Sequence, residues 1–189
     1  YIEYTNSKSM EERATKHDNI IISKSMSKMY ALSGIRVAYL VSNETIINKL
    51  KLITPPWAIS LPGQIAGICA LTDLEYYKKQ WAQTHLNREK LINDILKNND
   101  VEIVPTITNF FIVQLKEKYN ITADELMDEC IKDNLFLRNI SNMGSNNYSI
   151  RVTVKDELTN NKIVDIFTKK YKLLIEQKNI NGYKLRNLF

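Results

Sequence analysis

Apolar residues recur along the chain with two different spacings, and the beginning of the chain has the spacing of strands. The short apolar runs 19–23 and 36–41 are typical of buried strands. A turn-like segment that contains Ser33 and Gly34 separates them. The pattern therefore predicts two strands that flank the densest cluster of polar residues in the chain.

Helical spacing predominates in the middle of the chain. Asn43 can cap a helix that runs to about Lys51, and this helix must end before the prolines at 55–56 because proline lacks a backbone donor and restricts the residue before it. From about residue 73 to residue 97 the apolar positions predict a second helix, of about 25 residues and about 38 Å. A helix of that length suits a connection between two lobes.

The remainder of the chain returns to strands. Period-two patterns predict strands at 101–104, 110–115, 135–140 and 149–154. Residues 122–125 have the form of a capping box, which begins a helix between the second and third of these strands. A last helix begins at about Glu157 and has an apolar stripe formed by Ile163, Phe167, Tyr171 and Leu174. This order predicts an α+β layer.

Composition and charge are those of an ordinary globular protein. The 189 residues are 44% hydrophobic and 25% charged, with a formal net charge of +5. Residues 155–189 contain eight Lys and Arg against four Asp and Glu, so a solvated terminal helix explains most of the excess and nucleic acid is not an expected partner. The longest apolar run, 65–71, is far too short to span a membrane, and a membrane is not expected either.

The cysteines and histidines indicate a reducing environment without a metal site. Cys69 and Cys130 each lie inside an apolar helical pattern, which favours buried free thiols and a cytoplasmic protein. His17 and His85 have no cysteine or carboxylate at ligand spacing, so no metal is expected.

The polar residues after the first strand are the ones best suited to chemistry. Ser25, Ser27 and Lys28 follow that strand directly, and Arg36 comes eight residues after the lysine. A lysine condenses with an aldehyde only as the neutral amine, and partial burial beside a cation would lower its pKa. Hydroxyls and a guanidinium can bind a phosphate dianion. Spacing alone nevertheless favours the plainer interpretation, in which Lys24 and Lys28 are surface lysines, the serines are turn residues and Arg36 lies at a strand edge.

A resemblance to a known family changes this interpretation. Residues 25–39 read Ser-Met-Ser-Lys-Met-Tyr-Ala-Leu-Ser-Gly-Ile-Arg-Val-Ala-Tyr, which resembles the signature Ser/Thr-x-Ser-Lys-x-x-x-Leu-x-Gly-x-Arg-x-Gly-Tyr of class I/II aminotransferases. The branch of histidinol-phosphate aminotransferases and threonine-phosphate decarboxylases is the most similar. Five other segments resemble parts of that branch and occur in the order that they have there: residues 1–4, 55–57, 109–111, 137–138 and 150–152. The resemblance covers about residues 1–175.

The resemblance implies an α/β protein, the C-terminal part of a fold type I transferase that depends on pyridoxal 5'-phosphate. Residues 1–72 would be the end of the large cofactor-binding domain and its sheet, 73–98 an interdomain helix and 99–189 the small α+β domain. A homodimer is implied as well. The family's cofactor-ring aspartate would lie three residues before Tyr1, so we expect that the N-terminal remainder of the same protein, or another chain, is needed for activity.

The resemblance also assigns cofactor-binding residues. Lys28 would form the Schiff base with pyridoxal phosphate and then move the substrate's α-proton. Ser25, Ser27 and Arg36 would bind the cofactor phosphate, and Tyr1 would donate a hydrogen bond to its phenolate oxygen. The alternative for Tyr1 is an exposed aromatic residue at a frayed end. Family members usually have glycine at the positions of Ala31 and Ala38.

Two arginines are the implied substrate-binding residues. Arg151 alternates with the apolar residues of its predicted strand, and the resemblance makes it the clamp for the substrate's α-carboxylate. Arg138 would be its neighbour on the adjacent strand and would contact the carboxylate or a substrate phosphate. Either arginine can instead serve a structural ion pair.

The expected function is transfer of an amino group between an amino acid and a 2-oxo acid. The candidate amino acids include a phosphorylated one that is similar to histidinol phosphate. The same residues suit a decarboxylase of the threonine-phosphate type. A third reading is a non-catalytic effector module of a regulator, which a DNA-binding helix-turn-helix upstream would support. Residues 1–189 alone are expected to be inactive.

Overall fold

The computed structural model describes the backbone of residues 1–186 and the side chains of residues 1–180. The chain divides into two compact units, Tyr1–Ala82 and Gln83–Phe189. Helix α4 (Leu74–Leu96) runs through the boundary, close to the predicted span of 73–97. The division into 1–72, 73–98 and 99–189 remains a prediction, and the last three residues of its third part lie outside the described residues.

The first unit contains the two predicted strands. Strands β1 (Ile22–Ser25) and β2 (Ala38–Val41) pair antiparallel, with Ile22 opposite Val41. Both strands begin two or three residues later than the pattern predicts. For β2 the reason is Arg36, whose φ of 61° is left-handed and therefore incompatible with a strand.

Four helical segments accompany this strand pair: the 3-10 turn Ile2–Tyr4, α1 (Glu11–Lys16), α2 (Glu44–Ile53) and α3 (Leu61–Thr72). The predicted cap of α2 is confirmed, because the Asn43 side chain accepts a hydrogen bond of 2.9 Å from the Ile46 amide. The helix ends at Ile53, before the two prolines, as expected.

Helix α3 buries its small residues and leaves its large apolar residues outside. Gly63, Gly67 and Ala70 are on the buried side, and a Cβ placed on Gly67 would lie 3.4 Å from Val37 Cγ2. The opposite side carries the apolar stripe of α3, which consists of Leu61, Ile65 and Ile68 and is exposed by 67%, 54% and 64%. The small residues let the helix approach the loop between β1 and β2 closely.

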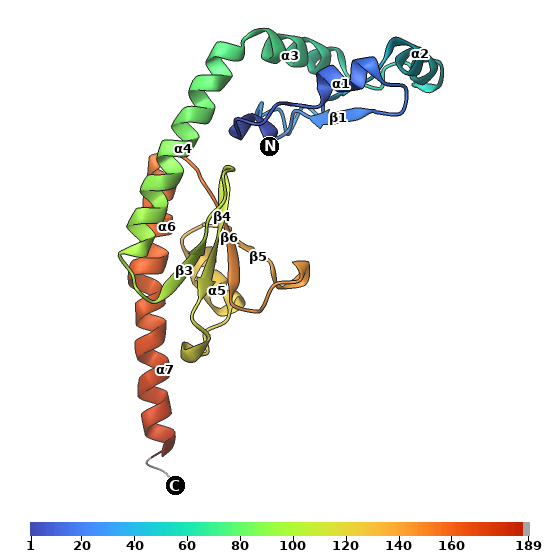
Figure 1. The fold of residues 1–189 in the computed structure, drawn as a ribbon. Coiled ribbons are helices and arrows are strands. Elements are labelled where there is room, and N and C mark those ends of the chain that lie inside the picture. Colours follow the sequence, from blue (N-terminus) through green and yellow to red (C-terminus); the bar gives the residue numbers. More distant parts are fainter. Residues whose placement is uncertain (187–189) are drawn as a thin grey trace. The chain divides into compact units, whose positions relative to one another are not determined.

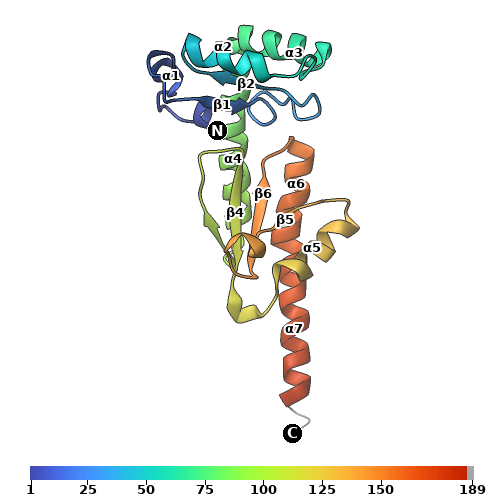
Figure 2. The same cartoon turned by 90° about the vertical axis from the view of Figure 1, so that its right-hand side faces the viewer.

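The second unit is a four-stranded antiparallel sheet with helices against it (Figures 1 and 2). The strand order is β3 (Val101–Val104), β4 (Phe110–Leu115), β6 (Ser149–Thr153) and β5 (Arg138–Asn139). The helices are α5 (Ala123–Lys132), α6 (Glu157–Asp165) and α7 (Tyr171–Arg186), and a π-helical turn, Ile166–Lys170, joins the last two. Two 3-10 turns lie at Glu117–Tyr119 and Ser141–Met143.

The core of the second unit lies on one face of this sheet. Phe111 is paired with Val152, and Val113 with Ile150, and all four side chains are fully buried. The predicted stripe of the terminal helix packs into the same core, with Ile163, Phe167 and Tyr171 buried and Leu174 partly buried. Alternation along β4 and β6 therefore sends the intervening residues to the other face.

Most of the predicted elements of this unit are confirmed. Strands 101–104 and 110–115 have the predicted bounds, and the capping box at 122–125 forms. The strand predicted at 135–140 is reduced to Arg138–Asn139. The cause is the end of α5, where Asn134 is left-handed with φ of 54° and the Leu135 amide still bonds to the Cys130 carbonyl.

The two cysteines differ in environment. Cys130 is buried as predicted, and this burial raises the pKa of its thiol to about 12. Cys69 is exposed, so the prediction of a buried thiol is wrong there. The reason is that α3 turns its glycine and alanine side, and not Cys69, toward the first unit's interior. Among the described residues, no helix combines the length and apolar character that crossing a membrane requires.

We expect an alkyl maleimide to modify Cys69 rapidly and Cys130 only after unfolding, because the thiolate is the reacting form and burial suppresses it at Cys130. Peptide mapping by mass spectrometry measures both rates. Cys69→Ser is the control and should leave no rapidly reacting thiol. Labelling of Cys130 at the rate of Cys69 without denaturant would contradict the packing described for α5.

Candidate functional site

The loop between β1 and β2, residues 26–37, holds the candidate site. The Met26 amide donates to the Val37 carbonyl (3.1 Å) and the Leu32 amide to the Met26 carbonyl (3.1 Å), which closes the loop on itself. Met26, Met29 and Tyr30 are buried. Because these three side chains face inward, Lys28 is directed outward and is exposed. The partial burial that the sequence predicted for Lys28 is therefore not observed.

A cavity of about 190 Å³ brings together three of the five predicted cofactor-binding residues. Tyr1, Ser25 and Lys28 line it, together with Glu3, Ser23, Lys24, Met29 and Tyr30. Within the part of the chain that the structure describes, the Lys28 amine has no hydrogen bond or ion pair. The amine is therefore available to a ligand.

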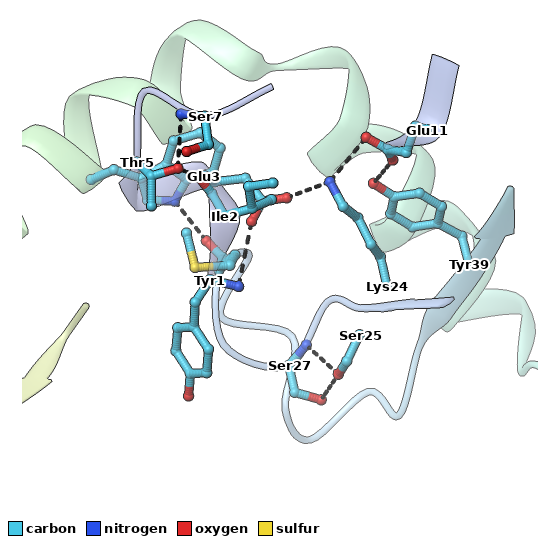
Figure 3. A network of polar contacts seen from close by, with 12 residues as sticks. Tyr1, Ile2, Glu3, Thr5, Ser7, Glu11, Lys24, Ser25, Ser27 and Tyr39 are labelled. Atoms are coloured by element: carbon cyan, nitrogen blue, oxygen red, sulfur yellow. Dashed lines mark hydrogen bonds and ion pairs between the residues drawn. The ribbon is translucent and has the colours of Figure 1, made fainter. Parts of the chain in front are cut away.

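Ser27, the fourth predicted cofactor-binding residue, is hydrogen-bonded to Ser25, which lines the cavity. The Ser25 hydroxyl donates to the Ser27 hydroxyl (3.1 Å), and the Ser27 amide donates to the Ser25 hydroxyl oxygen (3.3 Å), as Figure 3 shows. Two hydroxyl groups and a backbone amide thus lie at the end of β1. Their chemistry fits a small anion such as a phosphate group.

Arg36, the fifth predicted residue, is not among the residues that line the cavity. Its guanidinium donates to the Ser33 carbonyl (2.9 Å), within its own loop. Its backbone is left-handed, as is that of Ala31, with φ of 56°. A residue with a Cβ is strained in this conformation, so the loop holds strain at two positions around Lys28.

A polar network beside the cavity binds the other lysine of the segment. The Lys24 amine pairs with Glu3 Oε1 (2.7 Å) and Glu11 Oε2 (3.0 Å), and the Tyr39 hydroxyl donates to Glu11 Oε1 (2.8 Å) (Figure 3). No local pattern predicts this network, because Glu3 and Glu11 are 21 and 13 residues away from Lys24 in the sequence. The interpretation of Lys24 as an ordinary surface lysine is wrong.

Charge pairing holds Lys24 in its protonated form. Burial alone would lower the pKa of Lys24, but its hydrogen bonds to Glu3 and Glu11 outweigh burial and raise the pKa. Burial likewise opposes the charge of Glu3 and Glu11, yet hydrogen bonds, including those from Lys24, lower the pKa of both carboxyl groups. An amine that is held by two carboxylates is a poor nucleophile, whereas the Lys28 amine has no such partner in the described structure.

The two predicted substrate arginines lie next to each other in the second unit. Arg138 of β5 and Arg151 of β6 are direct partners in the antiparallel register, so their side chains project from the same face of the sheet. The Arg151 guanidinium lies 5.3 Å from the centre of the Phe110 ring, and its Nε is buried with no hydrogen-bond partner among the residues that the structure describes. An unsatisfied donor of this kind is suited to an anionic ligand.

A cavity of about 370 Å³ adjoins these arginines. It is lined by Arg138, Arg151 and Lys155, with no acidic residue, and by seven further residues: Asn134, Leu135, Phe136, Leu137, Thr153, Thr159 and Ile163. The excess of positive charge favours an anion such as a carboxylate or a phosphate.

Known proteins resemble this chain in sequence and in fold. The family model described as aminotransferase class I and II matches residues 3–167. Histidinol-phosphate aminotransferase of Methanocaldococcus jannaschii is 29% identical over 156 residues, which are 82% of this chain and 41% of that protein.

Two solved structures share the fold. The histidinol-phosphate aminotransferase of Clostridium acetobutylicum has a TM-score of 0.75 at 25% identity. The match covers 88% of this chain and 50% of the Clostridium chain. The L-threonine-O-3-phosphate decarboxylase of Porphyromonas gingivalis has a TM-score of 0.72 at 21% identity. The match covers 91% of this chain and 53% of the Porphyromonas chain.

The chain belongs to the aminotransferase class I and II family, whose members use pyridoxal phosphate. It spans about half the length of the relatives that it matches. The predicted fold, the C-terminal part of a fold type I transferase with a mixed α/β structure, is confirmed.

We expect the first unit to be most stable between about pH 5 and pH 10. The pKa of Glu3 and of Glu11 lies below the ordinary 4.5, so their contribution is complete above pH 4.5 and is lost as the pH falls through the lowered values. The pKa of Lys24 lies above the ordinary 10.5, so its contribution is complete below pH 10.5 and is lost as the pH rises through the raised value.

Urea unfolding followed by tryptophan fluorescence measures this pH dependence, because Trp57 and Trp81 both lie in the first unit. Lys24→Met should make the free energy of unfolding depend less on pH, both below and above the optimum. Lys16→Met is the control, since its ion pair with Glu12 is exposed and contributes little. Equal flattening in both variants would show that the Lys24 network is not the cause.

We expect Ala31→Gly to stabilise the protein by about 1 kcal/mol, because glycine adopts the left-handed conformation without strain. Ala38→Gly is a matched comparison at the other family glycine position. It should destabilise by about 0.5–1 kcal/mol, because Ala38 lies in the extended strand β2. Chemical denaturation measures both, and effects of the same sign would contradict the loop geometry.

Proposed function

We propose that this chain carries half of the active site of an aminotransferase, which moves an amino group between an amino acid and a 2-oxo acid. The observation that carries the proposal is the difference between the two lysines at β1. Lys24 is fixed by two carboxylates, whereas the Lys28 amine has no partner among the described residues and lines a cavity together with Tyr1 and Ser25.

In this proposal Lys28 holds pyridoxal 5'-phosphate and later takes and returns the proton at the substrate's α-carbon. The cofactor, when bound, supplies the electron sink for that proton transfer. The hydroxyls of Ser25 and Ser27 and the guanidinium of Arg36 bind its phosphate, and Tyr1 donates to its phenolate oxygen. The donors at the end of β1 fit such a group, because hydroxyls and an amine are what a phosphorylated aldehyde requires.

Arg151 is proposed as the clamp for the substrate's α-carboxylate, and Arg138 as its neighbour for that carboxylate or for a substrate phosphate. Their cross-strand pairing and the acid-free lining of their cavity support both roles. A phosphorylated substrate of the histidinol-phosphate type fits this density of positive charge. The ring of Phe110 under Arg151 restricts the guanidinium and so orients it.

Completion of the site by another polypeptide is part of the proposal. The apolar stripe of α3 (Leu61, Ile65 and Ile68) is exposed, and exposed apolar stripes commonly mark surfaces that pack against another segment. We propose that the N-terminal remainder of the same protein or a second chain covers this stripe. The whole protein would be a homodimer, as the family resemblance implies, and cytoplasmic, as its free cysteines indicate.

Decarboxylation remains the chemical alternative, because the P. gingivalis decarboxylase shares the fold. Assay of the complete protein for 2-oxo acid formation and for release of carbon dioxide separates the two reactions. Sustained release of carbon dioxide without transamination would refute the aminotransferase proposal.

We expect borohydride reduction in the presence of pyridoxal phosphate to attach the cofactor selectively to Lys28, below full stoichiometry and without turnover, because only part of the site is present. Mass spectrometry of peptides locates and quantifies the modification. Lys28→Arg should abolish it. Lys24→Arg, which keeps the ion pairs but cannot condense with an aldehyde, should leave it unchanged.

Two results would contradict this expectation. Preferential modification of Lys24 or another lysine would refute the role of Lys28. Stoichiometric modification of Lys28 with full transamination by residues 1–189 alone would show that no further polypeptide is required.

A further inference from the structure

Two side chains of α4 bind the backbone of the loop directly after Lys28. The Trp81 indole Nε1 donates to the Met29 carbonyl (2.9 Å), and the Tyr77 hydroxyl donates to the Tyr30 carbonyl (3.3 Å). Tyr77 and Trp81 are four residues apart on the helix and therefore lie on one face. One helix face thus reaches the two residues that follow the reactive lysine.

These hydrogen bonds supply donors for two carbonyls of the loop, those of Met29 and Tyr30. The backbone hydrogen bonds within the loop use the carbonyls of Met26, Lys28, Leu32 and Val37. The carbonyls of Met29 and Tyr30 accept from side-chain donors instead. Both residues are buried, and a buried carbonyl without a donor is costly. The donors of α4 therefore fix the peptide groups on both sides of Tyr30.

An aromatic cluster reinforces these hydrogen bonds. The Tyr30 ring makes edge contacts with the Tyr77 ring (centroids 5.0 Å apart, planes at 69°) and with the Trp81 ring (5.9 Å, 77°). Such edge contacts are favourable and directional. They fix the side chain of Tyr30. This residue immediately precedes the left-handed Ala31, where the loop stores strain.

We propose that Trp81 and Tyr77 are positioning residues for Lys28: they hold the Met29–Tyr30 backbone and thereby keep the Lys28 amine directed toward the cavity that it shares with Tyr1 and Ser25. Neither side chain acts on the ligand itself. The importance of this restraint for chemistry rests on the function proposed above for Lys28, whereas the restraint itself concerns only the loop.

Conservative variants separate the hydrogen bonds from aromatic packing. Trp81→Phe and Tyr77→Phe keep a ring on the helix face and remove the donor. Trp57→Phe is the matched control, because Trp57 is 91% exposed and has no hydrogen bond to the loop in the described structure. Hydrogen exchange at the amides of Met26, Ala31 and Leu32, which bond within the loop, reads the restraint without any cofactor.

In the wild type these amides should be protected. Trp81→Phe and Tyr77→Phe should each accelerate their exchange about three- to tenfold, the range expected for loss of one hydrogen bond, with little change at the amides of β2. The rate of borohydride trapping of pyridoxal phosphate at Lys28 should fall in parallel. Trp57→Phe should change neither quantity.

Two results would overturn the inference. One is loop exchange at the wild-type rate in both Trp81→Phe and Tyr77→Phe, and the other is faster exchange throughout the first unit, which would indicate general destabilisation. A third result concerns the proposed function instead. If the loop amides respond as expected but the wild type shows no trapping at Lys28, the restraint is supported and the cofactor role of Lys28 is refuted.

Discussion

The inward anchoring of the loop between β1 and β2 is the constraint on which the candidate site depends. Met26, Met29 and Tyr30 insert into the small core of the first unit. Helix α3 approaches Met26 and Val37 closely because it presents Gly67 there. With these three side chains buried, Ser25 and Lys28 are exposed on the other side of the chain. The direction of the Lys28 side chain is thus a consequence of apolar burial nearby.

Electrostatics then assigns different roles to two lysines that are four residues apart. Lys24 enters a partly buried network with Glu3 and Glu11, in which each charge stabilises the others, and its amine remains protonated. Lys28 has no such partner in the described structure. The same local sequence therefore contains one structural cation and one amine that is available for chemistry.

The second unit positions its charged residues by simple alternation. Burial of Phe111, Ile150 and Val152 on the helix-covered face sends Arg151 to the opposite face, where the register places it beside Arg138. The same alternation leaves two guanidinium groups side by side on the face of the sheet that is not packed against the core.

The sequence by itself determined the features that depend on neighbours along the chain. Strands 101–104 and 110–115, the caps at Asn43 and Thr122 and the apolar stripe of the terminal helix follow from periodicity and local hydrogen bonds. The adjacency of Arg138 and Arg151 was implied by the family resemblance, and the register of β5 and β6 agrees with it. The signature around Lys28 indicated the candidate site only through its resemblance to the family.

Only the tertiary structure decided the features that depend on residues far apart in sequence. The ion pairs of Lys24 join it to carboxylates 13 and 21 residues away, and the Trp81 donor reaches Met29 across 52 residues. The exposure of Cys69 depended on which side of α3 was buried, and an apolar pattern on all sides of a helix does not specify that side. Burial and long-range pairing are properties of the packed chain, and no local pattern encodes them.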